Sequence, residues 1–180
     1  MAQSGEPPAV KLICGILSCR VELLDAAGEA LAAALGPVDL TSDTMDFDFT
    51  HYYDRQMGSP LYRRFAGFAG PFAADTLADV KCRTNAIEAD FAARFGLVPP
   101  RPVNLDPGYV EPAKLVLASM KHFAHRIYLG RGVYAEVTLL WSRGRWRPLE
   151  WTFPDYASGR YDAFLSAARD ALRGLGGMRP

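Results

Sequence analysis

The chain has 180 residues, 49% of them hydrophobic, so it can bury a core of ordinary size in one domain. Its 20 Lys and Arg balance its 20 Asp and Glu, so the composition argues against a broad nucleic-acid-binding surface, although it allows a local basic patch. The first ten residues lack the pattern of a signal peptide and no apolar run is long enough to span a bilayer, so we expect a cytoplasmic protein without membrane contact.

The first half of the chain predicts alternating strands and long helices. Ser18 is a candidate helix cap, and Gly36 with Pro37 is a typical helix end. The three cysteines, odd in number and without metal-type spacing, are expected to be free thiols. The expected elements are a disordered lead-in at residues 1–9, a buried strand at Lys11–Leu17, a helix at Cys19–Leu35, paired strands at Val38–Phe49 and Arg64–Phe72, and a helix at Asp75–Phe95.

The second predicted helix carries polar residues at the rim of its buried stripe. At 100° per residue, Lys81, Asn85 and Glu88 align with one another beside the apolar face. Polar groups in that position form a structural network or face a cleft. Both interpretations are kept open.

The second half predicts one further helix and a series of hairpins before a C-terminal helix. Prolines make residues 98–102 an extended connector. The expected elements are a strand at Val103–Leu105, a turn at Asp106–Gly108, a helix at Ala113–Lys121, strands at His125–Leu129 and Val133–Trp141, a second hairpin turn at Ser142–Arg145, and a helix at Arg160–Arg173.

Together these elements predict an α+β fold built on an antiparallel sheet with helices on one face. The first six elements have the ferredoxin-like βαββαβ order, and a helix, a β-meander and a C-terminal helix follow. We expect a single domain over residues 10–173 and a frayed tail over residues 174–180.

The densest collection of reactive residues lies between residues 103 and 140. Lys114, Lys121, His125 and Arg126 could hold a phosphate or carboxylate. The simpler interpretation is that Lys121 is solvated, that Arg126 pairs with Glu136 across the sheet, and that Asp106 makes the turn with Pro107 and Gly108. For the cluster as a whole we favour a site, whose catalytic candidates are His125, Glu136 and Asp106 and whose ligand-binding candidates are Lys114, Ser119, Lys121, Arg126, Asp48, Tyr53, Lys81 and Asn85.

Metal and nucleotide motifs give little support to other chemistry. Asp46, Asp48 and His51 are close in sequence, and His122 and His125 are three residues apart, but no HExxH or CxxC spacing is present. The sequence also lacks the GxxxxGK loop and the GxSxG elbow. We therefore expect no metal and no cofactor.

Several segments resemble an uncharacterised prokaryotic family catalogued as domain of unknown function 4416. The resemblance covers nearly the whole chain in the family's order and implies no established activity. His51 and His122 depart from the family pattern, which weakens any role that needs them. The segments that carry it are KLICGILS (11–18), FDFTHYY (47–53) with Met57-Gly58, KCRTNAIE (81–88), NLDPGY (104–109), KLVLAS (114–119), HRIYLGRGVYAEVTL (125–139) and WTFPDY (151–156).

The leading hypothesis is a domain that binds a small anionic molecule in a cleft between Asp46–Tyr53 and Lys114–Glu136, with a catalytic role left open. The alternative is a non-catalytic domain that binds protein or RNA through a sheet edge or the aromatic loop, and a weaker alternative is a metal-dependent hydrolase. Convergence of Lys114, His125, Arg126 and Glu136 on a deep pocket would favour the first, and a flat apolar patch the second. Side chains on opposite faces of the sheet would argue against the first.

Overall fold

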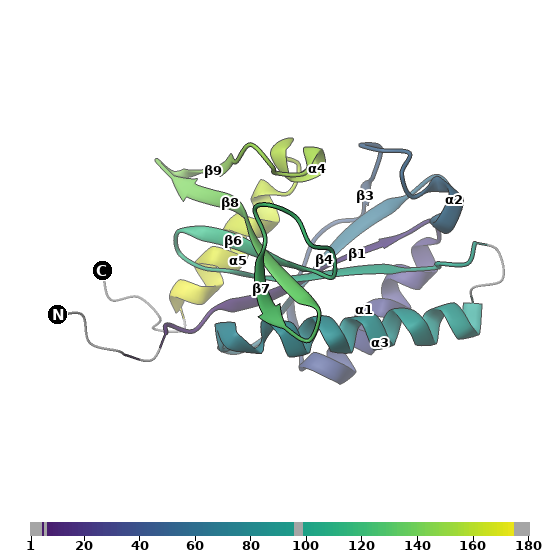
Figure 1. Cartoon of the computed structure of the whole chain (residues 1–180), viewed down its shortest axis with the longest axis horizontal. Helices are drawn as coiled ribbons and strands as arrows, with labels where there is room; N and C mark the ends of the chain where they lie inside the picture. Colours follow the sequence, from purple (N-terminus) through teal and green to yellow (C-terminus); the bar gives the residue numbers. More distant parts are fainter. Residues whose placement is uncertain (1–4, 6, 96–98, 175–180) are drawn as a thin grey trace.

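The protein has an α+β fold built on an antiparallel sheet, as predicted (Figure 1). In the described part of the chain this sheet has nine strands. The computed structural model describes residue 5, residues 7–95 and residues 99–174. The main path of the sheet runs β2-β4-β1-β5-β6-β8-β7, with β3 paired to β4 and β9 paired to β8. Among the described residues, no helix combines the length and the apolar character needed to cross a bilayer.

Strand β1 (Lys11–Ser18) is the centre of the first half of the sheet. All eight residues are buried, as a continuous apolar run predicts for a strand that is covered on both faces. It pairs with β4 (Tyr62–Phe68) on one side and with β5 (Asn104–Val110) on the other. The prediction of a buried central strand is confirmed.

Helices cover both faces of this sheet, whereas the sequence predicted helices on one face. The helices α1 (Val21–Leu35) and α3 (Leu77–Phe95) pack on the face that contains Leu12, Cys14 and Ile16. Helix α5 (Asp162–Gly174) packs on the opposite face, over Ile13 and Phe65 (Figure 1). The strand adjacency β2-β4-β1-β5 is observed, and the ferredoxin-like assignment stays a prediction.

Two predictions in the densest segment are wrong. Lys114–Ser119 is strand β6 and not a helix, and it pairs with β5 and β8 on its two sides. Its apolar run is continuous because α3 covers one face and α5 the other, which removes the alternation that marks a half-buried strand. Asp106–Gly108 is not a turn and lies inside β5. Gly108 is needed there because a Cβ would lie 2.3 Å from the Val116 carbonyl oxygen of β6.

The other predicted elements are present with shifted ends. The strand expected at Val38–Phe49 is divided into two short strands, both paired with β4. Most of the expected lead-in, part of the proline connector and most of the expected tail lie outside the described residues. The remaining elements are β2 (Val38–Thr41), β3 (Met45–Asp46), α2 (Asp54–Met57), a 3-10 turn at Ala74–Thr76, β7 (Ile127–Gly130), β8 (Val133–Ser142), β9 (Arg145–Pro148) and α4 (Pro154–Ala157).

A local opening of the sheet positions the candidate site. Pairing between β5 and β6 stops at Gly108 and Leu117. From there β5 continues along β1 to Asn104, while β6 continues along β8 to Ser119. The two strands therefore leave a gap, and the backbone of β5 needs other partners on that edge.

Candidate functional site

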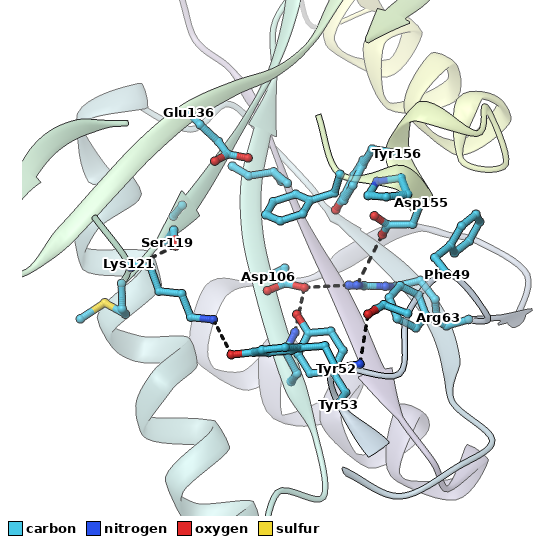
Figure 2. A pocket seen from close by; sticks show the side chains of 18 of the residues that line it. Phe49, Tyr52, Tyr53, Arg63, Asp106, Ser119, Lys121, Glu136, Asp155 and Tyr156 are labelled. Atoms are coloured by element: carbon cyan, nitrogen blue, oxygen red, sulfur yellow. Dashed lines mark hydrogen bonds and ion pairs between the residues drawn. The ribbon is translucent and has the colours of Figure 1, made fainter. Parts of the chain in front are cut away.

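A cavity of about 590 Å³ lies at this gap (Figure 2). Its volume is within the range of about 300–1,000 Å³ that small-molecule sites occupy. Its walls come from the divergent ends of β5 and β6, from α3, from residues 47–53, and from residues 153–156 at α4. The cavity combines aromatic side chains with five cations and three carboxylates.

Arg63 of β4 links two carboxylates in this cavity (Figure 2). Its Nη1 donates to Asp106 Oδ2 over 2.9 Å, and its Nη2 lies 3.8 Å from Asp155 Oδ2. The Arg63 side chain is only 3% exposed. Asp106 also accepts from Asn104 Nδ2 over 2.8 Å, and Asp155 accepts from the Tyr161 hydroxyl over 3.2 Å.

The surroundings of Arg63 depend on a glycine and two aromatic rings. Gly15 lies opposite Asp106 in the β1–β5 register, and a Cβ at Gly15 would approach Arg63 Nη1 to 2.7 Å. The guanidinium also lies over the rings of Phe47 and Phe65, at 5.2 and 5.8 Å from their centroids. The glycine in KLICGIL therefore gives room for an arginine that crosses β1.

The two carboxylates on Arg63 have opposite pKa shifts. Burial raises the pKa of Asp106, but the charges of Arg63 and Lys81 and the hydrogen bonds from Arg63 and Asn104 outweigh it, so this pKa lies below its usual value. Burial also raises the pKa of Asp155, and there the charge of Arg63 compensates incompletely while the charge of Asp106 raises the pKa further. Asp106 is thus the carboxylate that keeps its charge, and Asp155 is the one that holds a proton more readily.

Tyr156 brings an unpaired hydroxyl to the same wall. Its side chain is buried, and its hydroxyl has no hydrogen-bond partner among the described residues. Burial raises the Tyr156 pKa well above the usual tyrosine value, so the group is a neutral hydroxyl. Arg63 Nε is likewise buried without a partner in the described part of the chain.

A second ionic cluster forms around Glu136 of β8. Its Oε2 accepts from Arg126 Nε over 2.7 Å and is 2.9 Å from His125 Nε2. Arg126 also donates through Nη1 to Ser119 Oγ and to the Lys121 carbonyl, both over 2.9 Å. The pairing of Arg126 with Glu136 that the simpler interpretation predicted is therefore present.

Trp151 fixes the position of His125 in this cluster. The two rings are stacked, with centroids 5.1 Å apart and an interplanar angle of 9°. The Trp151 indole N–H donates to the Val137 carbonyl over 2.9 Å. His125 is thereby packed behind Glu136 and is not among the residues that line the cavity.

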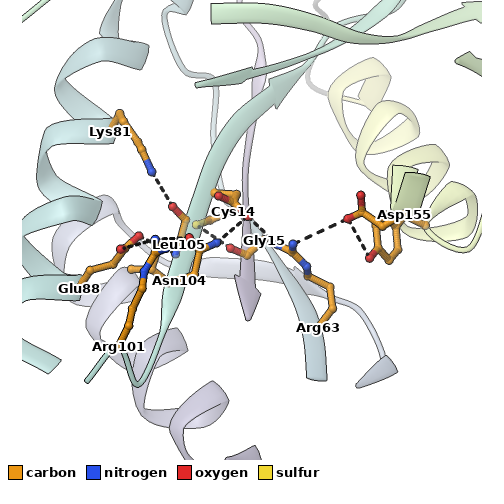
Figure 3. Close-up of polar contacts among 11 residues, drawn as sticks. Cys14, Gly15, Arg63, Lys81, Glu88, Arg101, Asn104, Leu105 and Asp155 are labelled. Carbon is orange, nitrogen blue, oxygen red and sulfur yellow. Dashed lines mark hydrogen bonds and ion pairs between the residues drawn. The ribbon is translucent and has the colours of Figure 1, made fainter. Parts of the chain in front are cut away.

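The polar rim of α3 supplies partners to the unpaired edge of β5 (Figure 3). Lys81 Nζ donates to the Leu105 carbonyl over 2.8 Å, and Glu88 Oε1 accepts from the Leu105 N–H over 2.8 Å. Arg101 then donates to Glu88 over 3.0 Å and also to the Asn104 side chain. The rim therefore forms a structural network and, through Lys81 and Asn85, faces the cavity as well.

Lys81 and Lys121 are the lining cations that form no ion pair with any described residue. Lys81 is 6% exposed. Lys121 Nζ donates to the Tyr52 hydroxyl over 3.1 Å and lies over the same ring. Arg63, Arg101 and Arg126 are each paired with a carboxylate.

The structure brings most of the predicted site residues together. Lys114 and Asp48 are outside the group: Lys114 pairs with Glu111 and Asp48 with Arg160. The predicted convergence therefore includes Arg126, Glu136 and the adjacent His125, and excludes Lys114. The predicted residues that line the cavity are Tyr53, Lys81, Asn85, Asp106, Ser119, Lys121, Arg126 and Glu136.

Arg63, Asp155 and Tyr156 are residues of the candidate site that were not predicted from the sequence. Asp155 and Tyr156 lie in WTFPDY, one of the segments that carried the family resemblance, so that segment was the available signal. Arg63 is 43 residues from Asp106, and no local pattern relates them. The strand expected in this region began one residue later, at Arg64, so Arg63 was not among the residues considered.

The histidines considered for a metal contact other side chains. His51 is fully exposed and pairs with Asp54, and His122 packs against Tyr134. Within the described ranges, no three His, Cys, Asp or Glu side chains gather so that they could hold a metal ion.

Comparison with known proteins gives one match. A family model described as Domain of unknown function (DUF4416) matches residues 8–172. No curated protein and no solved structure matches the chain.

Proposed function

The chain belongs to the family described as Domain of unknown function (DUF4416), and we propose that it binds a small molecule with a phosphate or carboxylate group in the cavity between β5 and β6. The observation that carries the proposal is the pair of lysines, Lys81 and Lys121, which line this cavity without a carboxylate partner among the described residues. The Lys81 side chain is buried, and a buried ammonium is costly unless an opposite charge reaches it. Lys121 lines the same cavity with an exposed side chain and adds a second positive charge there.

The lysines of the cavity match the requirements of an oxyanion. Each ammonium has three N–H donors, and one of these is used by the Leu105 carbonyl at Lys81 and by the Tyr52 hydroxyl at Lys121. The remaining donors can bind oxyanion oxygens. Asn85, which lines the cavity one helical turn beyond Lys81, adds an amide to the same region.

The remaining walls indicate that the ligand has an apolar or planar part. Phe49 and Tyr53 pack around Phe47 in edge-to-face contacts, and Phe153 contributes a further ring. Such rings bind apolar surface and planar groups, while the few polar groups fix orientation. The proposed ligand is therefore an anionic metabolite with a body beyond its charged group.

A thermal-shift and calorimetric comparison of two lysine variants tests the proposal. Pyrophosphate and citrate serve as probes, and a ligand at 100 times its dissociation constant stabilises the folded chain by about 2.7 kcal/mol. We expect stabilisation of the natural chain and its loss in Lys121→Met. Lys114→Met is the matched control, because Lys114 is a half-buried lysine outside the cavity. Equal effects in both variants, or no stabilisation of the natural chain by any anion, would contradict the proposal.

The alternative of an interaction domain has one observation in its favour. Strand β7 is an edge of the sheet, and its Ile127 and Tyr128 are 70% and 59% exposed. An apolar edge strand can accept an added strand from a second copy of the chain. Sedimentation velocity of the natural chain and of Ile127→Lys tests this candidate, since a monomer in both cases would contradict it.

A further inference from the structure

We propose that Asp155 is the proton donor of the cavity and that it acts on an oxygen atom of the bound molecule. The proposal deepens the proposed function and rests on it, because it assigns to the anion-binding cavity a group that performs general acid chemistry. The substrate class is then a small anionic molecule with a carbonyl, hydroxyl or ester oxygen within reach of residue 155.

The geometry around Arg63 separates the roles of the two carboxylates. Asp106 receives the short contacts, at 2.9 Å from Arg63 Nη1 and 2.8 Å from Asn104 Nδ2. Asp155 has the long contact of 3.8 Å with Arg63 Nη2, and a 3.2 Å hydrogen bond from the Tyr161 hydroxyl. One buried guanidinium thus faces two carboxylates and donates a direct hydrogen bond to Asp106, whereas Asp155 lies at the longer distance.

The groups that face Asp155 come from every element packed against it. Arg63 on β4 is the cation, Asp106 on β5 is a second acid, and the hydroxyls of Tyr156 and Tyr161 are neutral at ordinary pH. Burial, followed by the opposing effects of Arg63 and Asp106, leaves the pKa of Asp155 raised. A carboxyl group in this position retains its proton to higher pH than an exposed aspartate does.

Tyr156 gives independent support that a ligand atom reaches this wall. Tyr156 is among the residues that line the cavity, and its hydroxyl is buried without a partner in the described part of the chain. Figure 2 shows Tyr156 and Asp155 next to each other among the residues that line the cavity. A buried hydroxyl without a partner is costly, and an oxygen of a bound molecule would supply the missing hydrogen bond.

The proton transfer balances without any further reactant. The O–H bond of the Asp155 carboxyl breaks, its electron pair remains on Asp155, and the proton forms a bond to a lone pair of the ligand oxygen. The resulting carboxylate lies beside Arg63, which stabilises the new charge. A proton from solvent then returns residue 155 to its acid form.

An NMR titration of the full-length chain tests the assignment. The carboxyl carbons of aspartate are labelled with ¹³C, Asp155→Asn assigns the signal, and the titration is repeated with saturating pyrophosphate. We expect a midpoint for Asp155 above the usual value of about 3.9, and an increase of about one pH unit when pyrophosphate binds. By linkage, that increase equals about tenfold tighter binding of pyrophosphate to the protonated form.

Asp106→Asn is the control for the origin of the effect. It removes the neighbouring carboxylate that raises the Asp155 pKa, so the midpoint in the free chain should fall. A midpoint at or below about 3.9 in the natural chain would overturn the proposal. So would an unchanged midpoint in the presence of pyrophosphate that stabilises the chain, and in that case anion binding itself would stand. Absence of stabilisation by any anion would remove both the proposed function and this inference.

Discussion

Two ionic clusters with opposite compositions contribute side chains to the same cavity. Around Arg63, one guanidinium faces the carboxylates of Asp106 and Asp155. Around Glu136, one carboxylate contacts the guanidinium of Arg126 and the imidazole of His125. The first cluster has more acidic than basic side chains, and the second has more basic than acidic side chains.

The clusters also differ in how completely their hydrogen bonds are satisfied. Glu136 makes two contacts of 2.9 Å or less, and Arg126 fills further donors with Ser119 and the Lys121 carbonyl. The Arg63 cluster keeps a 3.8 Å contact and an unpaired Nε. We call the Glu136 cluster closed, because its polar groups are paired with one another, and the Arg63 cluster open, because some of its polar groups lack a close partner. A closed cluster stabilises the fold, whereas an open cluster has groups available to a ligand. The pairing of polar groups therefore distinguishes the two clusters better than the number of charges does.

The largest expected effect is that of Arg63→Met, which leaves two carboxylates in the cavity without their cation. Loss of one partner from a buried ion pair costs about 3–5 kcal/mol, and we expect the free energy of unfolding to fall by that amount in urea denaturation. Arg94→Met is the control, because the Arg94–Asp90 pair is exposed on α3 and is worth about 0.3–0.5 kcal/mol. Similar losses in the two variants would show that the Arg63 cluster does not stabilise the fold.

Glu136→Gln tests the closed cluster. The variant removes a charged acceptor but keeps a neutral one, so we expect a loss of about 1.5–3 kcal/mol in the free energy of unfolding. Pyrophosphate affinity should increase, because Arg126 then carries an uncompensated charge that faces the cavity. Calorimetric titration measures this affinity. Weaker binding of pyrophosphate to a folded Glu136→Gln chain than to the natural chain would contradict the view that Glu136 neutralises Arg126 in the cavity.

Sequence reasoning found the closed cluster because its members are close in the chain. His125, Arg126 and Glu136 lie within twelve residues of one another on the predicted hairpin, where strand pairing brings them together. Helical periodicity likewise placed Lys81 and Glu88 on the correct rim of α3.

The open cluster could not be found in this way, because it depends on the order of strands in the sheet. Arg63, Asp106 and Asp155 meet only when β4 and β5 flank β1 and α4 folds over them. The cavity also depends on the divergence of β5 and β6, and a segment predicted as a helix gave no indication of it. The pattern of apolar residues predicted the core, whereas the position of the site depends on pairing between strands that are far apart in the sequence.

Gly15→Ala tests the space on which the open cluster depends. The added methyl group would lie 2.7 Å from Arg63 Nη1 and 3.1 Å from the Phe65 ring, so the guanidinium must move. We expect a loss of about 1–3 kcal/mol in the free energy of unfolding, as for other overpacked sites. Gly28→Ala in α1 is the matched control, because no described atom apart from its chain neighbours and the backbone of α1 itself lies within 4 Å of the added methyl group. It should stabilise the chain by about 0.5–1 kcal/mol through helix propensity.

The opposite pKa shifts of Asp106 and Asp155 predict opposite pH trends for their asparagine variants. The Asp106 pKa is lowered on folding, so its contribution is present above the unfolded value of about 3.9 and is lost as the pH falls through the folded value. The Asp155 pKa is raised, so its contribution is present below about 3.9 and is lost as the pH rises through the folded value.

Urea denaturation at several pH values measures these trends, each at most about 1.4 kcal/mol per pH unit for a single group. The stability deficit of Asp106→Asn relative to the natural chain should shrink on acidification. Asp155→Asn should gain stability relative to the natural chain as the pH rises. Parallel trends would mean that the two carboxylates share one environment.

The smallest effect is expected for Tyr156→Phe, and its sign is informative. The hydroxyl is buried without a partner among the described residues, so its removal should leave the free chain as stable as before or up to about 1 kcal/mol more stable. Pyrophosphate affinity should fall, because the hydroxyl has its hydrogen bond only in the complex. Tyr161→Phe is the control, since the Tyr161 hydroxyl donates to Asp155 over 3.2 Å and its loss should destabilise the free chain. If Tyr156→Phe destabilised the free chain and left the pyrophosphate affinity unchanged, the Tyr156 hydroxyl would stabilise the fold and would not bind the ligand. The two clusters would then no longer differ in having a polar group available to a ligand.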